Sequence, residues 1–161
     1  MAKKISVGRS HSTTWEGTRN AAETDGAIAE THTRIDGLKI PHRLAYAVAG
    51  VLAVNDDQAG RLSPGVDFYP TNVRLAVPAG DEPAGSPIIV DIRVGGDSLF
   101  TGNGKPNIPD GKAVGNGKDF VLDVIKNGDD PLIDIDQVGS GTAGSNLTVV
   151  IHGYVFALGD E

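Results

Sequence analysis

The stretch Ile-Ile-Val-Asp-Ile-Arg-Val-Gly-Gly-Asp-Ser-Leu-Phe-Thr, residues 88–101, decides the fold class of this chain. Its first seven residues place a β-branched apolar side chain at every second position, which is the period of a strand with one buried face. Gly95-Gly96-Asp97 then gives the backbone the freedom that a tight hairpin turn requires. The stretch therefore predicts an antiparallel hairpin, with Asp91 and Arg93 on the face away from Ile88 and Val90.

Short apolar runs separated by turn residues continue this pattern on both sides. The 161 residues include 22 glycines and 9 prolines, a composition that suits a turn-rich β protein. Eight short strands without an amphipathic helix are typical of an antiparallel β-sandwich or jelly roll. We therefore expect an all-β, jelly-roll-like antiparallel β-sandwich over residues 44–161, with strands at 44–54, 61–69, 72–77, 88–94, 98–101, 120–124, 132–138 and 147–155.

Residues 1–43 differ from the rest in composition. Only six of these 43 residues are Leu, Ile, Val or Phe, against 36 of the following 118, and their net charge is +2 against −9. So few apolar side chains cannot bury a core, so we expect an extended N-terminal arm. The side chains that would then anchor a partner are Ile5, Val7, Trp15, Ile28, Ile35 and Leu38. Trp15, the only tryptophan, would dock into a neighbouring subunit or pack on the chain's own domain.

A long loop is expected over residues 102–117, rich in Gly, Asn and Pro, with Ile108 as its single firm apolar residue. Long loops in compact domains are usually functional or lie against a partner. Lys105, Ile108 and Lys112 are therefore candidate interface residues.

Several function classes are excluded by composition. The absence of cysteine excludes disulfides, a thiolate zinc site and a cysteine nucleophile. The four histidines form no i, i+4 pair, so we expect no metal and no cofactor. A net charge of −7 argues against sequence-independent binding to nucleic acid. No apolar run approaches the length of a membrane span or a signal sequence, and we expect neither.

Two motifs suggest chemistry, and both have a simpler interpretation. Residues 139–144 have the Gly-x-Gly-x-x-Gly spacing of a dinucleotide cradle, but β-prone residues follow where the cradle needs a helix, so we expect a hairpin loop. Asp134 and Asp136 alternate on one strand face and could serve calcium or a glycosidase pair. No Asp-x-Asp-x-Asp-Gly loop accompanies them, so a solvated acidic face is expected and no enzyme activity is predicted.

Two stretches resemble a module of tailed-bacteriophage virion proteins. AGDEPAGSPIIVDIRVGGDSLFT (79–101) is similar to its opening, where a loop of small residues leads into a hairpin that ends in Phe. LIDIDQVGSGTAGSNLTVVI (132–151) is similar to its closing strands. The similarity covers about residues 70–155 and leaves the arm outside. It implies a β-sandwich or jelly-roll virion component, as in decoration proteins of the shell or terminal modules of tails and fibres.

From this resemblance we expect a capsid decoration or cement protein, made in the host cytoplasm without a signal peptide and located on the capsid surface. Its partners would be the major capsid protein and further copies of itself, in a homotrimer on the particle. The alternative is a tail or fibre tip module that binds host-surface carbohydrate. An exposed platform built from several aromatic residues would favour that alternative, the candidates being Tyr46, Phe68, Tyr69, Tyr154 and Phe156.

Overall fold

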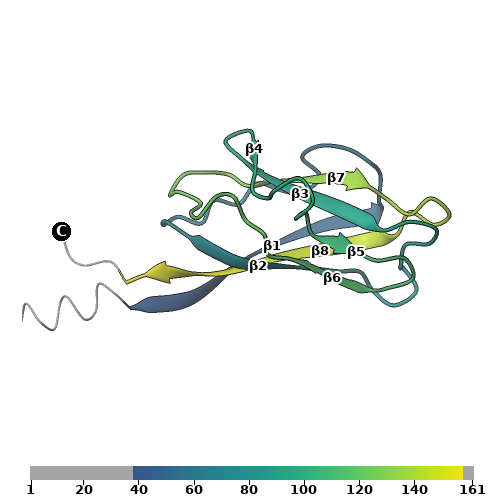
Figure 1. The fold of residues 1–161 in the computed structure, drawn as a ribbon, viewed down its shortest axis with the longest axis horizontal. Helices are drawn as coiled ribbons and strands as arrows, with labels where there is room; N and C mark the ends of the chain where they lie inside the picture. The colour runs from purple at the N-terminus through teal and green to yellow at the C-terminus, as the bar shows by residue number, and fades with distance from the viewer. Residues whose placement is uncertain (1–37, 158–161) are drawn as a thin grey trace, which may run out of the picture. The chain divides into compact units, whose positions relative to one another are not determined.

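Eight β-strands and no helix make up the described part of the chain, residues 38–157 of the computed structural model (Figure 1). The strands are β1 (Lys39–Val51), β2 (Tyr69–Ala76), β3 (Ile88–Val94), β4 (Asp97–Ser98), β5 (Asn107–Ile108), β6 (Val114–Gly117), β7 (Leu132–Gln137) and β8 (Ser145–Phe156). They form one sheet in the order β1-β8-β2-β6-β5-β3-β4, and β7 also pairs with β3.

The sheet curls, so that β3 and β7 lie across the core from β1, β8 and β2 (Figure 1). The pairs that β2 and β3 make with their neighbours are all antiparallel. The predicted all-β antiparallel fold is therefore confirmed, in the form of a curled sheet compatible with a sandwich. Residues Lys39–Val155 form one compact unit. Residues 1–37, which make up most of the predicted arm, lie outside the described residues.

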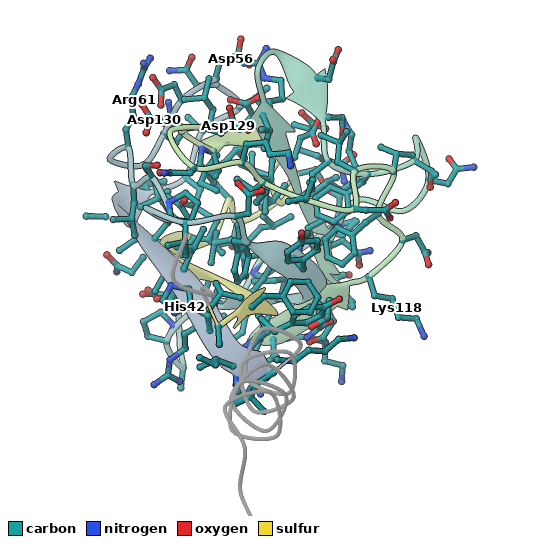
Figure 2. The ribbon with its side chains drawn as sticks, turned by 90° about the vertical axis from the view of Figure 1, so that its left-hand side faces the viewer. His42, Asp56, Arg61, Lys118, Asp129 and Asp130 are labelled. Carbon is teal, nitrogen blue, oxygen red and sulfur yellow. The ribbon has the colours of Figure 1, made fainter. Side chains whose placement is uncertain are left out.

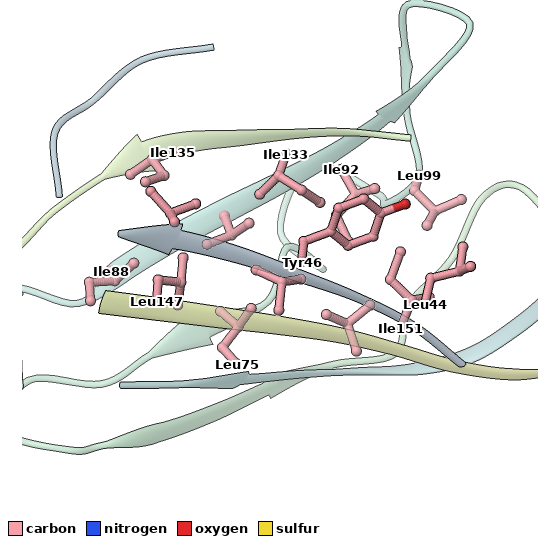
Figure 3. Packing of buried hydrophobic residues seen from close by; sticks show 14 of the residues in the cluster. Leu44, Tyr46, Leu75, Ile88, Ile92, Leu99, Ile133, Ile135, Leu147 and Ile151 are labelled. Carbon is pink, nitrogen blue, oxygen red and sulfur yellow. The ribbon is translucent and has the colours of Figure 1, made fainter. Parts of the chain in front are cut away.

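The core follows the alternation that the sequence of β3 predicts. Ile88, Val90 and Ile92 point inward and are fully buried, where they meet side chains of the opposite layer (Figure 3). Each such side chain contributes about 1.5–3 kcal/mol when it is removed from water. The opposite layer supplies Leu44, Tyr46, Leu75, Leu147 and Ile151.

Three expected elements differ from the structure. β1 begins at Lys39, five residues before the predicted strand and inside the range assigned to the arm. Residues 39–43 escaped prediction because all five are exposed, so they show no alternation of buried and exposed side chains. The predicted strands over 61–69 and 120–124 are wrong. In those ranges only Phe68 and Phe120 form isolated bridges, to Ile125 and Phe100, because the apolar side chains there anchor loops on the core.

The expected loop over 102–117 contains two short strands, β5 and β6. They are hard to predict because glycine and asparagine make up much of their sequence. Gly115 allows the two strands to pair, because it has no side chain to meet the backbone of β5. A Cβ atom at Gly115 would lie 1.7 Å from the carbonyl oxygen of Asn107. Ile108 is fully buried, so the segment belongs to the core sheet.

The glycine-rich residues 139–144 connect β7 to β8. β7 pairs with β3, while β8 pairs with β2, so this connection crosses between the layers and is not the hairpin loop that we expected. A strand follows it, which removes the helix that a dinucleotide cradle requires.

β2 contains a proline although it lies in the middle of the sheet. Pro70 has no N–H to donate, and such a residue is tolerated in a central strand only at an irregularity. The register between β2 and β8 shifts between Pro70 and Asn72, which leaves Thr71 as an extra residue. The resulting bulge turns Thr71 and Asn72 toward one side of the strand, opposite His152.

We predict that Gly115→Ala lowers the free energy of unfolding by about 1–3 kcal/mol or more, because its Cβ would overlap β5. Gly60→Ala is the matched control, since a Cβ there meets nothing within 4 Å. It should be neutral or stabilise by up to about 1 kcal/mol. Urea denaturation of both variants measures the difference, and equal midpoints would contradict the close approach of β5 and β6.

Candidate interaction surface

Charged side chains form a cluster on the outer face of β3 and β7. The register places Asp91 of β3 directly opposite Asp134 of β7, and these residues are only 5% and 2% exposed. Two buried carboxylates in adjacent strands repel each other unless cations neutralise them. Arg93 and Lys105 provide that neutralisation.

Each cation of the cluster contacts two carboxylates. Lys105 Nζ lies 2.8 Å from Asp91 Oδ2 and 2.7 Å from Asp136 Oδ2. Arg93 donates from Nε to Asp134, and its Nη2 lies 3.5 Å from Asp56 Oδ2. The second oxygen of Asp91 accepts hydrogen bonds from Ser98 Oγ at 2.6 Å and from the N–H of Ile92 at 2.8 Å.

The cluster is a structural element. Burial opposes the charge of Lys105, but its hydrogen bonds to Asp136 and Asp91 outweigh that effect and raise the pKa of its ammonium group above the ordinary value. Because the charges satisfy one another, the cluster ties Lys105, and with it the segment after Thr101, to β3 and β7.

The prediction of a solvated acidic face at Asp134 and Asp136 is therefore wrong for Asp134, which is buried. Asp136 is exposed, as that prediction requires. Asp134 is covered because residues 55–58 run along β7, where the N–H of Asp57 donates to Asp134 Oδ1 at 2.7 Å. The alternation of β3 already placed Asp91 and Arg93 on the outer face. The register between β3 and β7, which no local pattern gives, was needed to pair them.

The candidate interface residues of the 102–117 segment lie in three different environments. Ile108 is fully buried, so it offers no surface to a partner. Lys105 is engaged by Asp91 and Asp136. Lys112 is exposed. The expected interface loop therefore contributes Ile108 to the core and leaves only Lys112 of the three candidates open to a partner.

Of the arm residues expected to anchor a partner, only Leu38 belongs to the described part of the chain. Its side chain is 56% exposed, and its carbonyl oxygen accepts a 3.0 Å hydrogen bond from Ala157. Ile5, Val7, Trp15, Ile28 and Ile35 lie outside the described residues.

The two edges of the sheet are treated differently. Residues 55–58 cover β7: Asn55 exchanges two backbone hydrogen bonds with Ile135, at 3.1 and 2.9 Å, and the N–H of Gln58 reaches Ile133 at 2.8 Å. β1 stands at the other end of the sheet, next to β8 alone. Within residues 38–157, no segment pairs with its second edge.

The exposed side chains of β1 are small and uncharged along most of the strand. Leu44, Tyr46 and Val48 point into the core. The exposed positions from 45 onward are Ala45, Ala47, Ala49, Gly50 and Val51, and Val51 is 80% exposed. No charged residue occurs between Arg43 and Asp56. Lys39, Pro41 and Arg43 protect the start of β1 against pairing with another strand, but the stretch from Ala45 to Val51 carries neither charge nor proline.

The aromatic candidates divide between core and surface. Tyr46 and Phe68 are buried, and burial together with the charge of Asp130 raises the pKa of the Tyr46 hydroxyl, which donates to the carbonyl of Leu62 at 3.0 Å. Tyr69 and Tyr154 stack with ring centroids 5.3 Å apart. Lys39 Nζ lies 4.4 Å from the centroid of the Tyr154 ring. Phe156 is half-buried.

Over 38–157, no three His, Asp or Glu side chains come together as a set that could hold a metal ion. The same range contains no helix long and apolar enough to cross a membrane. None of the protein-family models, curated proteins or solved structures compared with the chain matches it.

We predict that Lys105→Met lowers the free energy of unfolding by about 1–3 kcal/mol, because it leaves the buried Asp91 carboxylate without its cation. The exposed Lys112→Met is the control and should change stability by less than about 0.5 kcal/mol. The pKa of Lys105 is raised above 10.5, so its contribution is complete below that pH and is lost as the pH rises through the folded value. If the difference in the free energy of unfolding between the two variants stayed unchanged well above the folded-state pKa of Lys105, that result would contradict the ion pairs.

Proposed function

We propose that this chain is a structural component of a tailed-phage virion, namely a capsid decoration protein that binds the outside of the shell and ties its subunits together. The observation that carries the proposal is the edge of β1 that no segment of residues 38–157 covers. The resemblance of residues 79–101 and 132–151 to phage virion modules supplies the class of particle.

The edge supports an assembly role because it is a specific exception within the fold. The chain covers its β7 edge with residues 55–58, and β4, at the end of the sheet, is only two residues long. β1, by contrast, has 13 residues, and its stretch from Ala45 to Val51 exposes only alanine, glycine and valine. A strand of this kind is stabilised when a strand of a neighbouring subunit continues the sheet.

The proposed neighbour at this edge is the major capsid protein. Pairing of β1 with β1 of a second copy would be isologous and would give a two-fold dimer. The homotrimer that we propose on the particle therefore needs other contacts between copies, and the exposed Lys112 is the residue of the 102–117 segment that stays available for them. Many weak contacts in a closed shell would add through multivalency.

The acidic side of the domain suits the surface that faces solvent. Asp56, Asp129 and Asp130 gather at one side of the unit around Arg61 (Figure 2). Arg61 pairs with Asp57 at 3.3 Å, so the other carboxylates leave this side negative. Like charge on the outside would keep particles apart in solution.

Host-carbohydrate recognition by a tail or fibre tip module is the second candidate. The stacked pair of Tyr69 and Tyr154 favours it, since two of the five aromatic candidates meet on one part of the surface. The other candidates do not extend this pair into a broad platform, because Tyr46 and Phe68 are buried.

We predict that the double variant Ala47→Lys, Ala49→Lys folds normally but loses attachment to shells that lack this protein. Two lysines on an exposed edge oppose strand pairing and cost little in the free domain. Co-sedimentation with such shells should show occupancy reduced by about tenfold or more. Val121→Lys, at an exposed loop position outside β1, is the control and should attach normally. Full occupancy by the double variant would remove the β1 edge from the interface.

We also predict that a chain lacking residues 1–37 keeps its folded domain, because the compact unit begins at Lys39. Its attachment to shells should weaken, since every proposed arm anchor except Leu38 is lost. The cut belongs at residue 37 because β1 starts at Lys39. Circular dichroism reports the fold and co-sedimentation reports attachment; undiminished attachment would place the whole binding surface on the domain.

A further inference from the structure

The outer face of β1, β8, β2, β6 and β5 carries a row of polar side chains that runs across the strands. These side chains point outward because each one is next in sequence to a residue whose side chain is buried in the core, and successive side chains of a strand point to opposite faces. Arg43 precedes buried Leu44, His152 follows buried Ile151, and Asn72 precedes buried Val73. Asn116 is the register partner of Arg74, and Asn107 is the partner of Asn116, so both share this face.

Two hollows lie along this row. The first, about 480 Å³, is lined by Pro41, His42, Arg43, Thr71, His152 and Gly153. The second, about 260 Å³, is lined by Asn72, Asn107, Asn116 and Lys118 together with the loop residues 103–105 and their neighbours Gly117 and Asp119. The bulge in β2 joins them, since Thr71 borders the first hollow and Asn72 borders the second.

The wall of the second hollow is built by close backbone contacts. A Cβ at Gly117 would lie 2.8 Å from Pro106, and one at Gly104 would lie 2.7 Å from Asp119 Cβ and from Thr101 Oγ1. Lys105, held by Asp91 and Asp136, fixes the same loop from the other side. The hollow is therefore a preformed feature of the folded domain.

The amide groups of this hollow are not engaged by any other residue in the described part of the chain. Asn72, Asn103, Asn107 and Asn116 make no side-chain hydrogen bond within residues 38–157. Outside the hollow, Asn146 bonds Gly50 and Asp81, and Gln137 bonds the carbonyl of Pro87, while the amide of Asn127 is exposed and makes no such bond within the described residues. Each free amide presents two donors and an acceptor, a combination that matches the paired hydroxyl groups of a sugar.

The cations of the face are also without acidic partners. In the described part of the chain, Arg61, Arg93, Lys105 and Lys126 form ion pairs with aspartates. Arg43, Arg74 and Lys118 form none, and all three lie on or beside the row. Figure 2 shows His42 and Lys118 on the side of the unit opposite Asp56, Asp129 and Asp130. Against the single carboxylate of Asp119 at the second hollow, Arg43, Arg74 and Lys118 leave the face with a net positive charge in a domain that is negative as a whole.

We propose that this face binds an acidic oligosaccharide, laid across the strands from the hollow at Arg43 to the hollow at Lys118. Four strand spacings of about 4.8 Å give roughly 19 Å, which suits an extended ligand better than a single ion. The asparagines would bind hydroxyl groups, and Arg43 and Lys118 would bind carboxylates. The inference is independent of the decoration role, because it uses neither the arm nor the free edge of β1.

The test is binding of the full chain to an immobilised panel of defined oligosaccharides, in which each uronic acid or sialic acid member has a neutral counterpart. At physiological salt we expect retention of at least one acidic oligosaccharide, with its neutral counterpart bound about tenfold or more weakly. No retained acidic member, or equal binding of the neutral counterpart, would overturn the proposal. Equal competition by polyglutamate would also overturn it, because the face would then be a general cationic patch.

Variants of the retained complex locate the site. Asn107→Ala combined with Asn116→Ala, and separately Lys118→Gln, should each weaken binding by about tenfold or more. The controls Asn127→Ala and Lys112→Gln change an exposed amide and an exposed cation outside both hollows, and they should alter binding by less than about twofold. Equal losses in test and control variants would refute the site. Attachment to shells should be unchanged in both test variants and in Asn127→Ala, none of which changes a residue of the proposed shell contacts, so failure here is distinct from failure of the decoration role.

Discussion

The hydrogen-bond ladder of the sheet ends at β1, and much of the molecule is arranged around that ending. Every strand N–H and C=O group needs a partner or water, and an edge strand presents a row of them. At the β7 edge the chain supplies the partner itself, through Asn55 and Gln58. At the β1 edge the described chain supplies none, and from Ala45 to Val51 the exposed residues of the strand are alanine, glycine and valine without charge. This asymmetry between the two edges is the basis of the assembly role that we propose.

A second dependence links the inner sheet to the outer face. Asp91 and Asp134 lie opposite each other because the pairing of β3 with β7 places them there. Their burial requires Arg93 and Lys105, and Lys105 in turn holds the loop that walls the hollow beside Lys118. The ion pairs therefore do more than stabilise: they preorganise a surface, which lowers the entropic cost of binding a ligand there. The edge and the polar face are separate surfaces of one domain.

The sequence predicted the elements in which local period and burial agree. β3, β7 and β8 alternate cleanly, and each was found close to its expected range. β5 and β6 escaped prediction because their pairing depends on Gly115 meeting the backbone of Asn107, a tertiary contact that has no local signature. The apolar residues around Phe68 and Phe120 predicted strands but pack loops on the core. The site residues Asn72, Asn107 and Asn116 are ordinary surface residues in sequence, and only the register brings them together.

Hydrogen exchange at the β1 amides tests the central claim most directly, because it reads the free edge itself. The rates are compared residue by residue between the free chain and the chain bound to shells. The account predicts that alternate amides of residues 39–51, those that point away from β8, exchange rapidly in the free chain and become protected on the shell. Equal rates in both states, with new protection appearing only elsewhere on the domain, would contradict it.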